Sequence, residues 1–392
     1  MAKRETVRVA ERVKTLPPYL FARIDQLRNE ARRKGVDVID LGVGDPDEPT
    51  PAPIVAAMQR AAADPANHKY PAYEGSFAFR KSCADYLKKR LGAALDPASE
   101  ILALIGSKEG IGHLPLAFVD PGDLVLVPDP GYPVYAIATR FCGGEPHFMP
   151  LRAENGFMPD LSRVPAKAWN RAKILWLNYP NNPTGARATR EFFLEAIRLC
   201  AKYGVLLAHD AAYFEIYAGR ERPLSILELP GGREVGVEFY SFSKTFNMTG
   251  WRIGFAAGQA AAINALGRVK NNLDSGAFTA VQQATVAGNA RLAALIGPIR
   301  RLYAGRRKET VKAMQRAGFD VFDAGATFYI WTRTPAGSTS AEFAMRALAK
   351  AGVVVTPGTG FGPSGEGYFR VALCAPQARI LEGVRRLAAV RG

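Results

Sequence analysis

The sequence contains no apolar run that approaches the roughly 18 residues needed to span a bilayer. Its opening stretch, MAKRETVRVAERVKTLPPY, is charged throughout and lacks the apolar core of a secretory signal. Cysteine is scarce, and the four residues have no paired spacing: Cys83, Cys142, Cys200 and Cys374. This pattern favours buried free thiols over a disulfide framework or a zinc site. We therefore expect a cytoplasmic protein with no membrane span and no metal.

Acidic residues are fewer than basic ones, and the formal net charge is +15. A basic surface can indicate nucleic-acid binding. Here the Lys and Arg residues are scattered or occur at helical spacing, and no aromatic-rich basic segment accompanies them. A solvated basic surface that favours anionic ligands explains the charge more simply. We expect no nucleic-acid partner.

The length of 392 residues and a hydrophobic content of 48% allow a large core, divided between two domains. From about residue 100 to 260, β-rich runs alternate with helical patterns: ILALI, LVLVP, KILWLN, VLLAHD and GVEFYSFS, with helices expected at 109–119, 132–141 and 189–203. This alternation predicts an α/β fold with a mainly parallel sheet between helices. In the last of these helices, Thr189 is the expected N-cap and Gly204 the expected end.

After about residue 290, strands and helices mix at irregular spacing, which predicts a smaller α+β domain. The strand VDVIDLGVG, in the N-terminal arm, is expected to pack with it. We thus predict a large domain at 49–289, and a small domain formed by 1–48 and 290–392. Active sites of open α/β sheets lie beyond the carboxyl ends of the strands, and four segments there carry reactive or anion-binding side chains.

The first of these segments, SFSKTFNMTGWRIG, places Lys244 in a turn after a strand. Most such lysines are solvated surface residues. Ser241 and Arg252 distinguish this one, because both can bind a phosphate and the planar Arg fork donates two hydrogen bonds at once. The segment alone leaves both interpretations open.

A second segment, VLLAHDAAYFEI, ends an apolar strand with Asp210. Burying a carboxylate costs several kcal/mol unless it meets a cation or donors. A protonated pyridine nitrogen would supply that cation, and Tyr213 could then reach the phenolic oxygen of the same ring. The alternative for Asp210 is a helix N-cap.

The two remaining segments also follow strands. LNYPNNPTG forms a tight turn from which Asn182 could donate to a phenolic oxygen, although turn formation alone would explain its Pro and Gly residues. ILALIGSKEG places Ser107 and Lys108 at a helix N-terminus, where backbone N–H groups favour an anion. In DPGYPVY, Tyr132 could cover an aromatic ring or be an ordinary packed side chain.

Together, in this order, the segments resemble the class I/II aminotransferases of pyridoxal 5′-phosphate (PLP) fold type I, whose large domain has a mainly parallel seven-stranded sheet. The resemblance implies that Lys244 binds PLP as a Schiff base and carries the proton of the 1,3-shift. It implies that Asp210 pairs with the ring nitrogen, Asn182 and Tyr213 bind the phenolic oxygen, and Tyr132 stacks on the ring. The implied phosphate-binding residues are Ser107, Lys108, Ser241 and Arg252, and Ser243 is a further cofactor-binding residue.

Two further roles come only from this resemblance. Arg370, in GYFRVALC, matches the arginine that grips the substrate α-carboxylate; otherwise it would be an exposed strand residue. Tyr70, in KYPAYEGSF, matches a tyrosine that reaches the phosphate of the neighbouring subunit. The second match implies a homodimer with shared active sites.

Within the family, LPPYLFARI, DLGVGDPDEPTP, GSKEGI, DPGYPVY and SKTFNMTGWRIG resemble the LL-diaminopimelate aminotransferase branch of lysine biosynthesis. This implies transfer between LL-diaminopimelate and 2-oxoglutarate, with Tyr19 and Gly44 in the substrate pocket beside Asn182 and Arg370. The chain departs from the branch at Thr279, where an asparagine is usual, which leaves the specificity less secure than the chemistry.

Two rival functions stay open, and a third is disfavoured by the length of the N-terminal arm. A broad-specificity aspartate or alanine aminotransferase would use the same residues, and so would a PLP-dependent carbon–sulfur lyase, which needs no oxo acid. A PLP-sensing transcription regulator would need an N-terminal DNA-binding domain, and only about 40 residues precede the first family motif.

Overall fold

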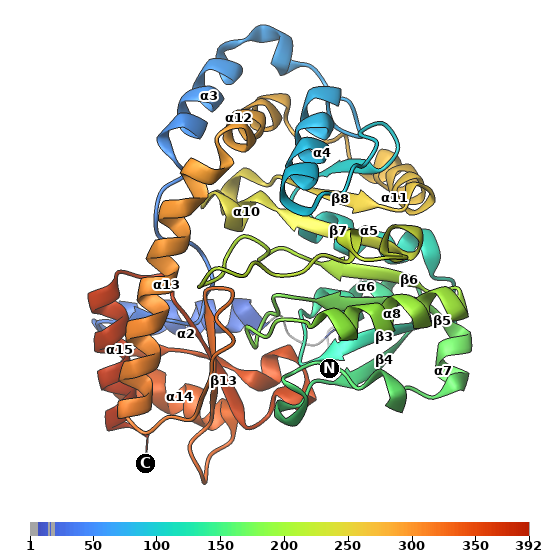
Figure 1. The fold of residues 1–392 in the computed structure, drawn as a ribbon. Helices are drawn as coiled ribbons and strands as arrows, with labels where there is room; N and C mark the ends of the chain where they lie inside the picture. The colour runs from blue at the N-terminus through green and yellow to red at the C-terminus, as the bar shows by residue number, and fades with distance from the viewer. Residues whose placement is uncertain (1–6, 15, 17–19, 392) are drawn as a thin grey trace.

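The computed structural model describes residues 7–14, 16 and 20–391. At its centre is a seven-stranded sheet with the order β2-β8-β7-β6-β5-β3-β4, in which β8 runs antiparallel to both neighbours and the other pairings are parallel (Figure 1). The strands are β2 (Ile101–Leu104), β3 (Leu124–Asp129), β4 (Glu145–Pro150), β5 (Ala172–Asn178), β6 (Leu206–Asp210), β7 (Gly236–Ser241) and β8 (Gly254–Gly258). The predicted mainly parallel sheet is confirmed.

Helices cover both faces of this sheet, because successive side chains of each strand point to opposite sides. In β5, Trp176 belongs to a core shared with α5, α6 and α11, whereas Leu175 and Leu177 belong to a core shared with α4 and α8. The elements are α4 (Phe77–Leu91), α5 (Ser107–Phe118), α6 (Val134–Phe141), α8 (Arg190–Tyr203) and α11 (Ala260–Leu273). Two buried faces explain why the central strands are apolar along their whole length.

Helix α8 follows the predicted pattern closely. The Thr189 side chain accepts a hydrogen bond from the backbone N–H of Phe192 and so caps the helix. Gly204 ends it at φ 67°, a left-handed conformation that glycine adopts without the cost of a Cβ. Cys200 lies buried on the inner face, as a free thiol.

The alternating sequence pattern does not predict β4 and β8. Strand β4 lies at the edge of the sheet, is largely exposed and contains two prolines, so it lacks the apolar run of a buried strand. Strand β8, GFAAG, is fully buried but has no β-branched residue. Packing against neighbouring strands, more than the β-propensity of their own residues, explains why both segments form strands.

The C-terminal part forms a second, antiparallel sheet with the order β12-β13-β10-β9. Its strands are β9 (Val321–Phe322), β10 (Tyr329–Arg333), β12 (Thr356–Pro357) and β13 (Tyr368–Ala372). Beside it, β1 (Ile39–Asp40) of the N-terminal arm pairs in parallel with β11 (Val353–Val354). This part of the arm therefore lies with the C-terminal segment, while the boundaries at 48/49 and 289/290 stay a prediction.

Long helices connect and flank the two sheets. In Figure 1, α13 extends along one side of the molecule from α12 to the region of α14 and α15. The remaining helices are α1 (Glu11–Lys14), α2 (Leu20–Arg33), α3 (Ala52–Ala63), α7 (Ala166–Arg171), α9 (Gly232–Val235), α10 (Phe242–Thr245), α12 (Thr279–Ala290), α13 (Leu292–Arg316), α14 (Ser340–Ala351) and α15 (Gln377–Ala389). Among the described residues, no helix combines the length and the apolarity that crossing a bilayer requires.

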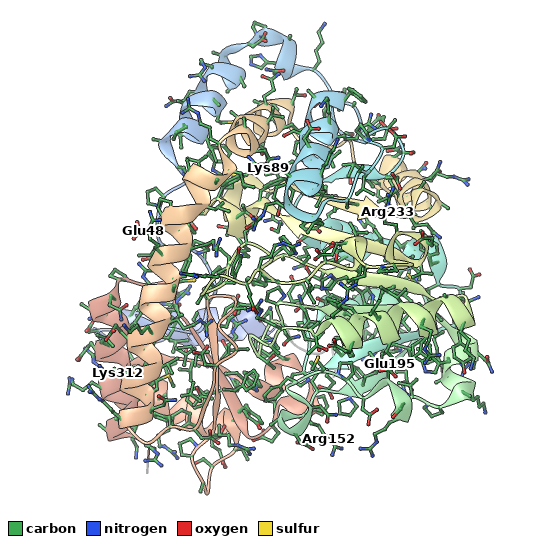
Figure 2. The ribbon with its side chains drawn as sticks, viewed as in Figure 1. Glu48, Lys89, Arg152, Glu195, Arg233 and Lys312 are labelled. Carbon is green, nitrogen blue, oxygen red and sulfur yellow. The ribbon has the colours of Figure 1, made fainter. Side chains whose placement is uncertain are left out.

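Charged side chains are distributed around the molecule. Figure 2 shows Lys89 on α4, Arg152 after β4 and Lys312 on α13 projecting at widely separated places, and all three are exposed. The four cysteines are free thiols. Cys83 and Cys200 are buried as predicted, whereas Cys142 and Cys374 are partly exposed.

Candidate active site

A cavity of about 450 Å³ lies at the edge of the large sheet where the parallel strands end. The turns after β2, β3, β5, β6 and β7 supply most of its lining. The rest comes from the N-terminal arm after β1, from Arg252 before β8, and from β10 and β13 of the second sheet. Of the residues predicted from the sequence, the following line it: Gly44, Ser107, Lys108, Tyr132, Asn182, Asp210, Tyr213, Ser241, Ser243, Lys244, Arg252 and Arg370. Four segments far apart in the chain are thus brought to one place, as a doubly covered α/β sheet predicts.

Of the site residues named in the sequence analysis, Tyr70 and Thr279 do not line the cavity. Tyr70 is 86% exposed on the outer surface. Thr279 begins α12 and is partly exposed. Tyr19 lies outside the described residues. The role predicted for Tyr70 involves a second subunit, so a single chain does not test it.

Lys244 extends into the cavity from α10, directly after β7. Its Nζ atom donates to the carbonyl oxygen of Gly44 at 3.5 Å. Burial lowers the pKa of Lys244, and the positive charges of Arg252 and Arg370 lower it further, while Cys374 and Asp45 oppose the shift. The amine is therefore neutral at a lower pH than an ordinary lysine, which suits a nucleophile or a general base.

Asp210 ends β6, lines the same cavity and is only 5% exposed. Its Oδ2 atom accepts a hydrogen bond from the Tyr135 hydroxyl at 2.7 Å, and its Oδ1 atom accepts one from the N–H of Ala212 at 3.2 Å. Burial nevertheless raises the pKa of Asp210. The next helical element in this described stretch begins at Ile226, which rules out the N-cap alternative. Burial disfavours the ionised form of this carboxylate, and a cationic ligand beside it would stabilise that form.

One end of the cavity forms a cradle for an anion. Ser107 is the first residue of α5, and no side chain caps that helix N-terminus. The Arg252 guanidinium lies so close to Gly106 that a Cβ added there would be 2.3 Å from Nη2. Arg252 has a left-handed backbone (φ 54°) and donates to the Thr249 carbonyl at 2.8 Å. Strain of this kind persists where the surroundings fix a functional side chain.

Ser243 adds to this polar lining. Its hydroxyl oxygen is buried and has no hydrogen-bond partner in the described structure. A buried hydroxyl without a partner is costly. A phosphate oxygen at this end of the cavity would satisfy it, and the arrangement therefore fits an anionic ligand.

The other end of the cavity is organised by Arg370, which is 1% exposed and not the exposed strand residue of the alternative interpretation. Its Nη1 donates to Asn182 Oδ1 at 2.7 Å, and its Nη2 donates to the Gly42 carbonyl at 2.7 Å. Since the Asn182 oxygen is used by Arg370, the amide NH₂ group is the end of Asn182 that can serve a ligand. The Arg370 guanidinium can therefore bind a carboxylate group of a ligand, and the Asn182 amide beside it can donate to an acceptor oxygen of the ligand.

Two tyrosines that line or support the cavity escape the sequence reasoning. Tyr135 holds Asp210 and stands three residues after Tyr132, and this spacing within the helix expected at 132–141 could have indicated it, although α6 begins at Val134. Tyr329 begins β10, and its hydroxyl lies 3.0 Å from that of Tyr213. No local signal marks Tyr329, because it reaches the cavity from the second sheet.

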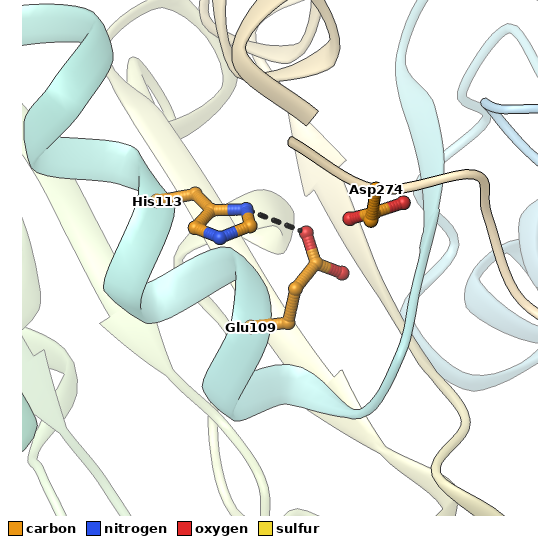
Figure 3. A group of neighbouring side chains, drawn as sticks. All are labelled: Glu109, His113 and Asp274. Carbon is orange, nitrogen blue, oxygen red and sulfur yellow. Dashed lines mark ion pairs between the residues drawn. The ribbon is translucent and has the colours of Figure 1, made fainter. Parts of the chain in front are cut away.

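A separate group of side chains could in principle meet at a metal ion. Among the described residues, ligand atoms of Glu109, His113 and Asp274 lie within 4.8 Å of one another, and His113 pairs with Glu109 at 3.0 Å (Figure 3). The buried Lys270 ammonium already lies 2.8 Å from Asp274 and 3.3 Å from Glu109. The chain thus supplies its own cation to these carboxylates, and the absence of a metal stays a prediction.

Comparison with known proteins agrees with this geometry. Residues 36–387 match the family model described as aminotransferase class I and II. The LL-diaminopimelate aminotransferase of Aquifex aeolicus (strain VF5) is 51% identical over 96% of this chain and 98% of its own. That of Desulforudis audaxviator (strain MP104C) is 53% identical over 96% of each chain.

Solved structures are similar over nearly the whole chain. Substrate-bound BacF from Bacillus subtilis has a TM-score of 0.94 at 34% identity and covers 98% of both chains. A probable N-succinyldiaminopimelate aminotransferase from Thermus thermophilus has a TM-score of 0.89 at 37% identity, over 95% of this chain and 100% of its own. The predicted PLP fold type I is confirmed, and the chain belongs to the aminotransferase class I and II family.

Proposed function

We propose that this chain is a PLP-dependent aminotransferase that transfers an amino group between LL-diaminopimelate and 2-oxoglutarate. One observation carries the proposal: Lys244 and the buried Asp210 line the same cavity, between an anion cradle and Arg370. This combination matches a ligand that has an aldehyde for the lysine, a basic ring nitrogen for the acid and a phosphate for the cradle.

The residues fit PLP at each of these points. Lys244 would hold the cofactor covalently, and Asp210 would pair with its ring nitrogen. Tyr213 and the Asn182 amide would bind the phenolic oxygen, and Tyr132 would cover the ring. The phosphate would be held by Ser107, Lys108, Ser241, Ser243 and Arg252, with the Ser243 hydroxyl gaining the partner that it lacks. When bound, PLP withdraws electrons and stabilises negative charge at the substrate α-carbon.

The remaining chemistry belongs to the chain itself. Arg370 binds the substrate α-carboxylate through its planar fork and thereby fixes the α-carbon. The neutral Lys244 amine accepts the α-proton as general base and delivers it again as general acid, which its lowered pKa favours. Asp210 would carry its negative charge beside the ring nitrogen, while the Tyr135 hydroxyl and the Ala212 N–H hold its two oxygens in place.

The substrate is inferred from relatives that share about half of their residues with this chain over nearly its full length. Gly44 lines the cavity beside Lys244, and we propose that it contacts the substrate together with Tyr19, Asn182 and Arg370. The test is a panel of LL-diaminopimelate, meso-diaminopimelate, aspartate and alanine, each with 2-oxoglutarate. We expect the highest kcat/KM with the LL isomer. Higher kcat/KM with aspartate or alanine would contradict this substrate, and release of ammonia without an oxo acid would indicate a lyase.

We further propose a homodimer in which Tyr70 contributes to the partner's phosphate site. Tyr70 is almost fully exposed, and exposed apolar side chains lie near it in sequence or across the 274–278 turn: Tyr73, Phe77 and Phe278. The backbone of residues 72 and 73 approaches Gly276, which brings these two surface segments together. Aromatic residues exposed in this way are typical of interface cores.

Mixing two variants that each lack one residue of the shared site tests the proposal. In a hybrid dimer of Lys244→Ala and Tyr70→Ala subunits, one site combines an intact Lys244 with an intact Tyr70. We therefore expect that mixing and refolding the two variants restores activity, measured as glutamate formation, to about a quarter of the wild-type value for random pairing. If each site is built from one chain, the mixture will show no more activity than the Tyr70→Ala protein alone.

Arg370→Gln is expected to lower kcat/KM about 10²- to 10³-fold for every amino donor. Truncating a buried charge that pairs with a ligand costs roughly 3–4 kcal/mol, and glutamine cannot replace the guanidinium fork. Steady-state kinetics measures the change. The control is Arg333→Gln, which removes a largely exposed arginine from β10 of the same sheet and should leave kcat/KM unchanged. Equal effects of the two substitutions would rule out a specific carboxylate-binding role for Arg370.

A further inference from the structure

A buried arginine fixes the chain segment that leads into β10. Arg307, on α13, is 4% exposed and donates from Nη2 to three carbonyl oxygens, those of Ala326 (2.6 Å), Thr327 (2.9 Å) and Tyr329 (2.8 Å). Its Nη1 binds Asp323 at 2.6 Å. One guanidinium therefore ties together four points of a seven-residue stretch, which only a planar group with several donors can do.

The segment that Arg307 holds is strained. Thr327 has φ 62°, a left-handed conformation that is rare for a β-branched residue. Its N–H donates to the Ile216 carbonyl at 2.8 Å, and its hydroxyl oxygen accepts from the N–H of Tyr329 at 3.0 Å. Such a conformation persists only where several contacts determine it together, and it often marks a functional position.

The side chain presented by this segment is Tyr329, which lines the cavity. The Arg370 guanidinium carbon lies 3.9 Å from the centroid of the Tyr329 ring and 4.7 Å from that of Phe361. The Tyr329 hydroxyl lies 3.0 Å from that of Tyr213 and packs directly against Gly44. A Cβ added to Gly44 would be only 1.9 Å from that hydroxyl, so the close approach requires glycine.

We propose that Tyr329 is a positioning residue that couples Arg370 to Tyr213 in the active site, and that Arg307 acts on the reaction through Tyr329. The inference rests on the proposed aminotransferase function. The Tyr329 ring holds the plane of the Arg370 guanidinium in the orientation that meets a carboxylate. Its hydroxyl hydrogen-bonds Tyr213 and so directs the Tyr213 O–H toward the phenolic oxygen of the cofactor. Burial raises the pKa of both tyrosines, which keeps them protonated as donors.

Two substitutions separate the ring from the hydroxyl. Tyr329→Phe keeps the ring over Arg370, so we expect KM values near wild type but a shift of about 0.5–1 unit in the pH at which the absorbance of bound PLP changes, as loss of one hydrogen bond implies. Tyr329→Leu removes the ring, so we expect KM for the amino donor and for 2-oxoglutarate to rise about 3- to 30-fold, with a smaller change in kcat. The Kd of glutarate, an unreactive dicarboxylate, should rise by the same factor in calorimetry.

Arg307→Lys tests the indirect step. A lysine keeps the charge but cannot bind three carbonyls and Asp323 at once, so KM should rise in the same direction as in Tyr329→Leu. In the double variant the two KM effects should overlap and not multiply, because both act on the same ring. The control is Tyr86→Phe, which loses a buried tyrosine hydrogen bond to Glu215 (2.8 Å) outside the cavity lining and should change neither the KM nor the pH profile.

The outcomes are distinct. Unchanged KM and glutarate Kd in Tyr329→Leu, with an unchanged pH profile in Tyr329→Phe, would overturn the role of Tyr329. Fully multiplicative effects in the double variant would overturn the role of Arg307. The Tyr329 variants leave the Arg307 contacts to the backbone intact, so they test the proposal even if Arg307→Lys does not fold. A wild-type protein without a PLP absorbance band or transamination would instead refute the proposed function.

Discussion

Lys244→Ala is expected to abolish transamination, lowering kcat by about 10⁴-fold or more. The substitution removes both the amine that holds the cofactor and the base that moves the α-proton, and loss of general acid–base catalysis alone accounts for about 10²- to 10⁴-fold. The visible absorbance band of the PLP-loaded protein should change at the same time. Glutamate production and the absorbance spectrum are the two measurements.

The matched control is Lys350→Ala, which removes an exposed lysine from α14 and should leave both measurements unchanged. Borohydride reduction of the PLP-loaded wild type followed by peptide mapping gives an independent result, and the label should appear at Lys244. Attachment at another lysine, or turnover by Lys244→Ala at a rate near wild type, would refute the assignment and with it the mechanism.

Most parts of the site that sequence reasoning located lie at the end of an apolar strand or shortly after it, whereas Arg370 lies within β13. Asp210 is the last residue of β6 and Lys244 follows the end of β7 by three residues, so the position of the strand fixes the position of the side chain. Because parallel strands end at one edge of a sheet, separate motifs could be assigned to a common cavity before any contact was known. The specific roles also required the family resemblance, since Asn182 or Ser107 alone is compatible with an ordinary turn or helix start.

Tyr329 could not be placed in this way. Its segment, TFYIWTR, predicts a strand, and β10 confirms that strand. What brings the Tyr329 ring to Arg370 is the registry of β10 with β13, in which Tyr329 pairs with Ala372, together with the contacts of Arg307 from α13. These interactions join segments that are tens of residues apart, and no periodicity within one segment encodes them. The same limit applies to Glu109 and Asp274, which meet around Lys270 through packing of α5 against α11.

The missed strands show a different limit. Apolar residues accumulate in a strand where its side chains are buried. An alternating or continuous apolar run therefore predicts buried strands and misses strands that are exposed or packed by small residues. Strand β4 lies at the sheet edge and needs few apolar residues, and β8 is so tightly packed that four of its five residues are glycine or alanine. Gly254 illustrates the second case, since an added Cβ would lie 2.5 Å from the Tyr240 carbonyl oxygen. Local preference therefore underestimates strands whose composition is set by their neighbours.

Asp210→Asn is expected to lower kcat about 10²- to 10³-fold, the usual loss when one preorganised electrostatic group is removed from an active site. Asparagine matches the shape of aspartate but cannot keep a ring nitrogen protonated. The matched control is Asp129→Asn, another buried carboxylate at a strand end, which accepts hydrogen bonds from Ser364 and does not line the cavity. Its kcat should stay close to wild type. A loss in Asp129→Asn as large as that in Asp210→Asn would point to general damage at the sheet edge.

Asp210→Asn should lower kcat, but it should leave the cofactor-free protein at least as stable as wild type at pH 7. Burial raises the pKa of Asp210 above its unfolded value near 3.8, so the folded protein loses stability as the pH rises from that value through the folded pKa. Asparagine carries no charge, and the Tyr135 hydroxyl can turn to accept from its amide, so the variant avoids this loss. Cofactor-free Asp210→Asn should therefore unfold at an equal or higher temperature than wild type at pH 7, and the difference should shrink toward pH 4.

With PLP bound the order should reverse, because only the aspartate gains an ion pair with the cofactor. Thermal unfolding of both proteins, with and without PLP at the two pH values, tests this, and a cofactor-free variant clearly less stable than wild type at pH 7 would show that Asp210 stabilises the fold itself.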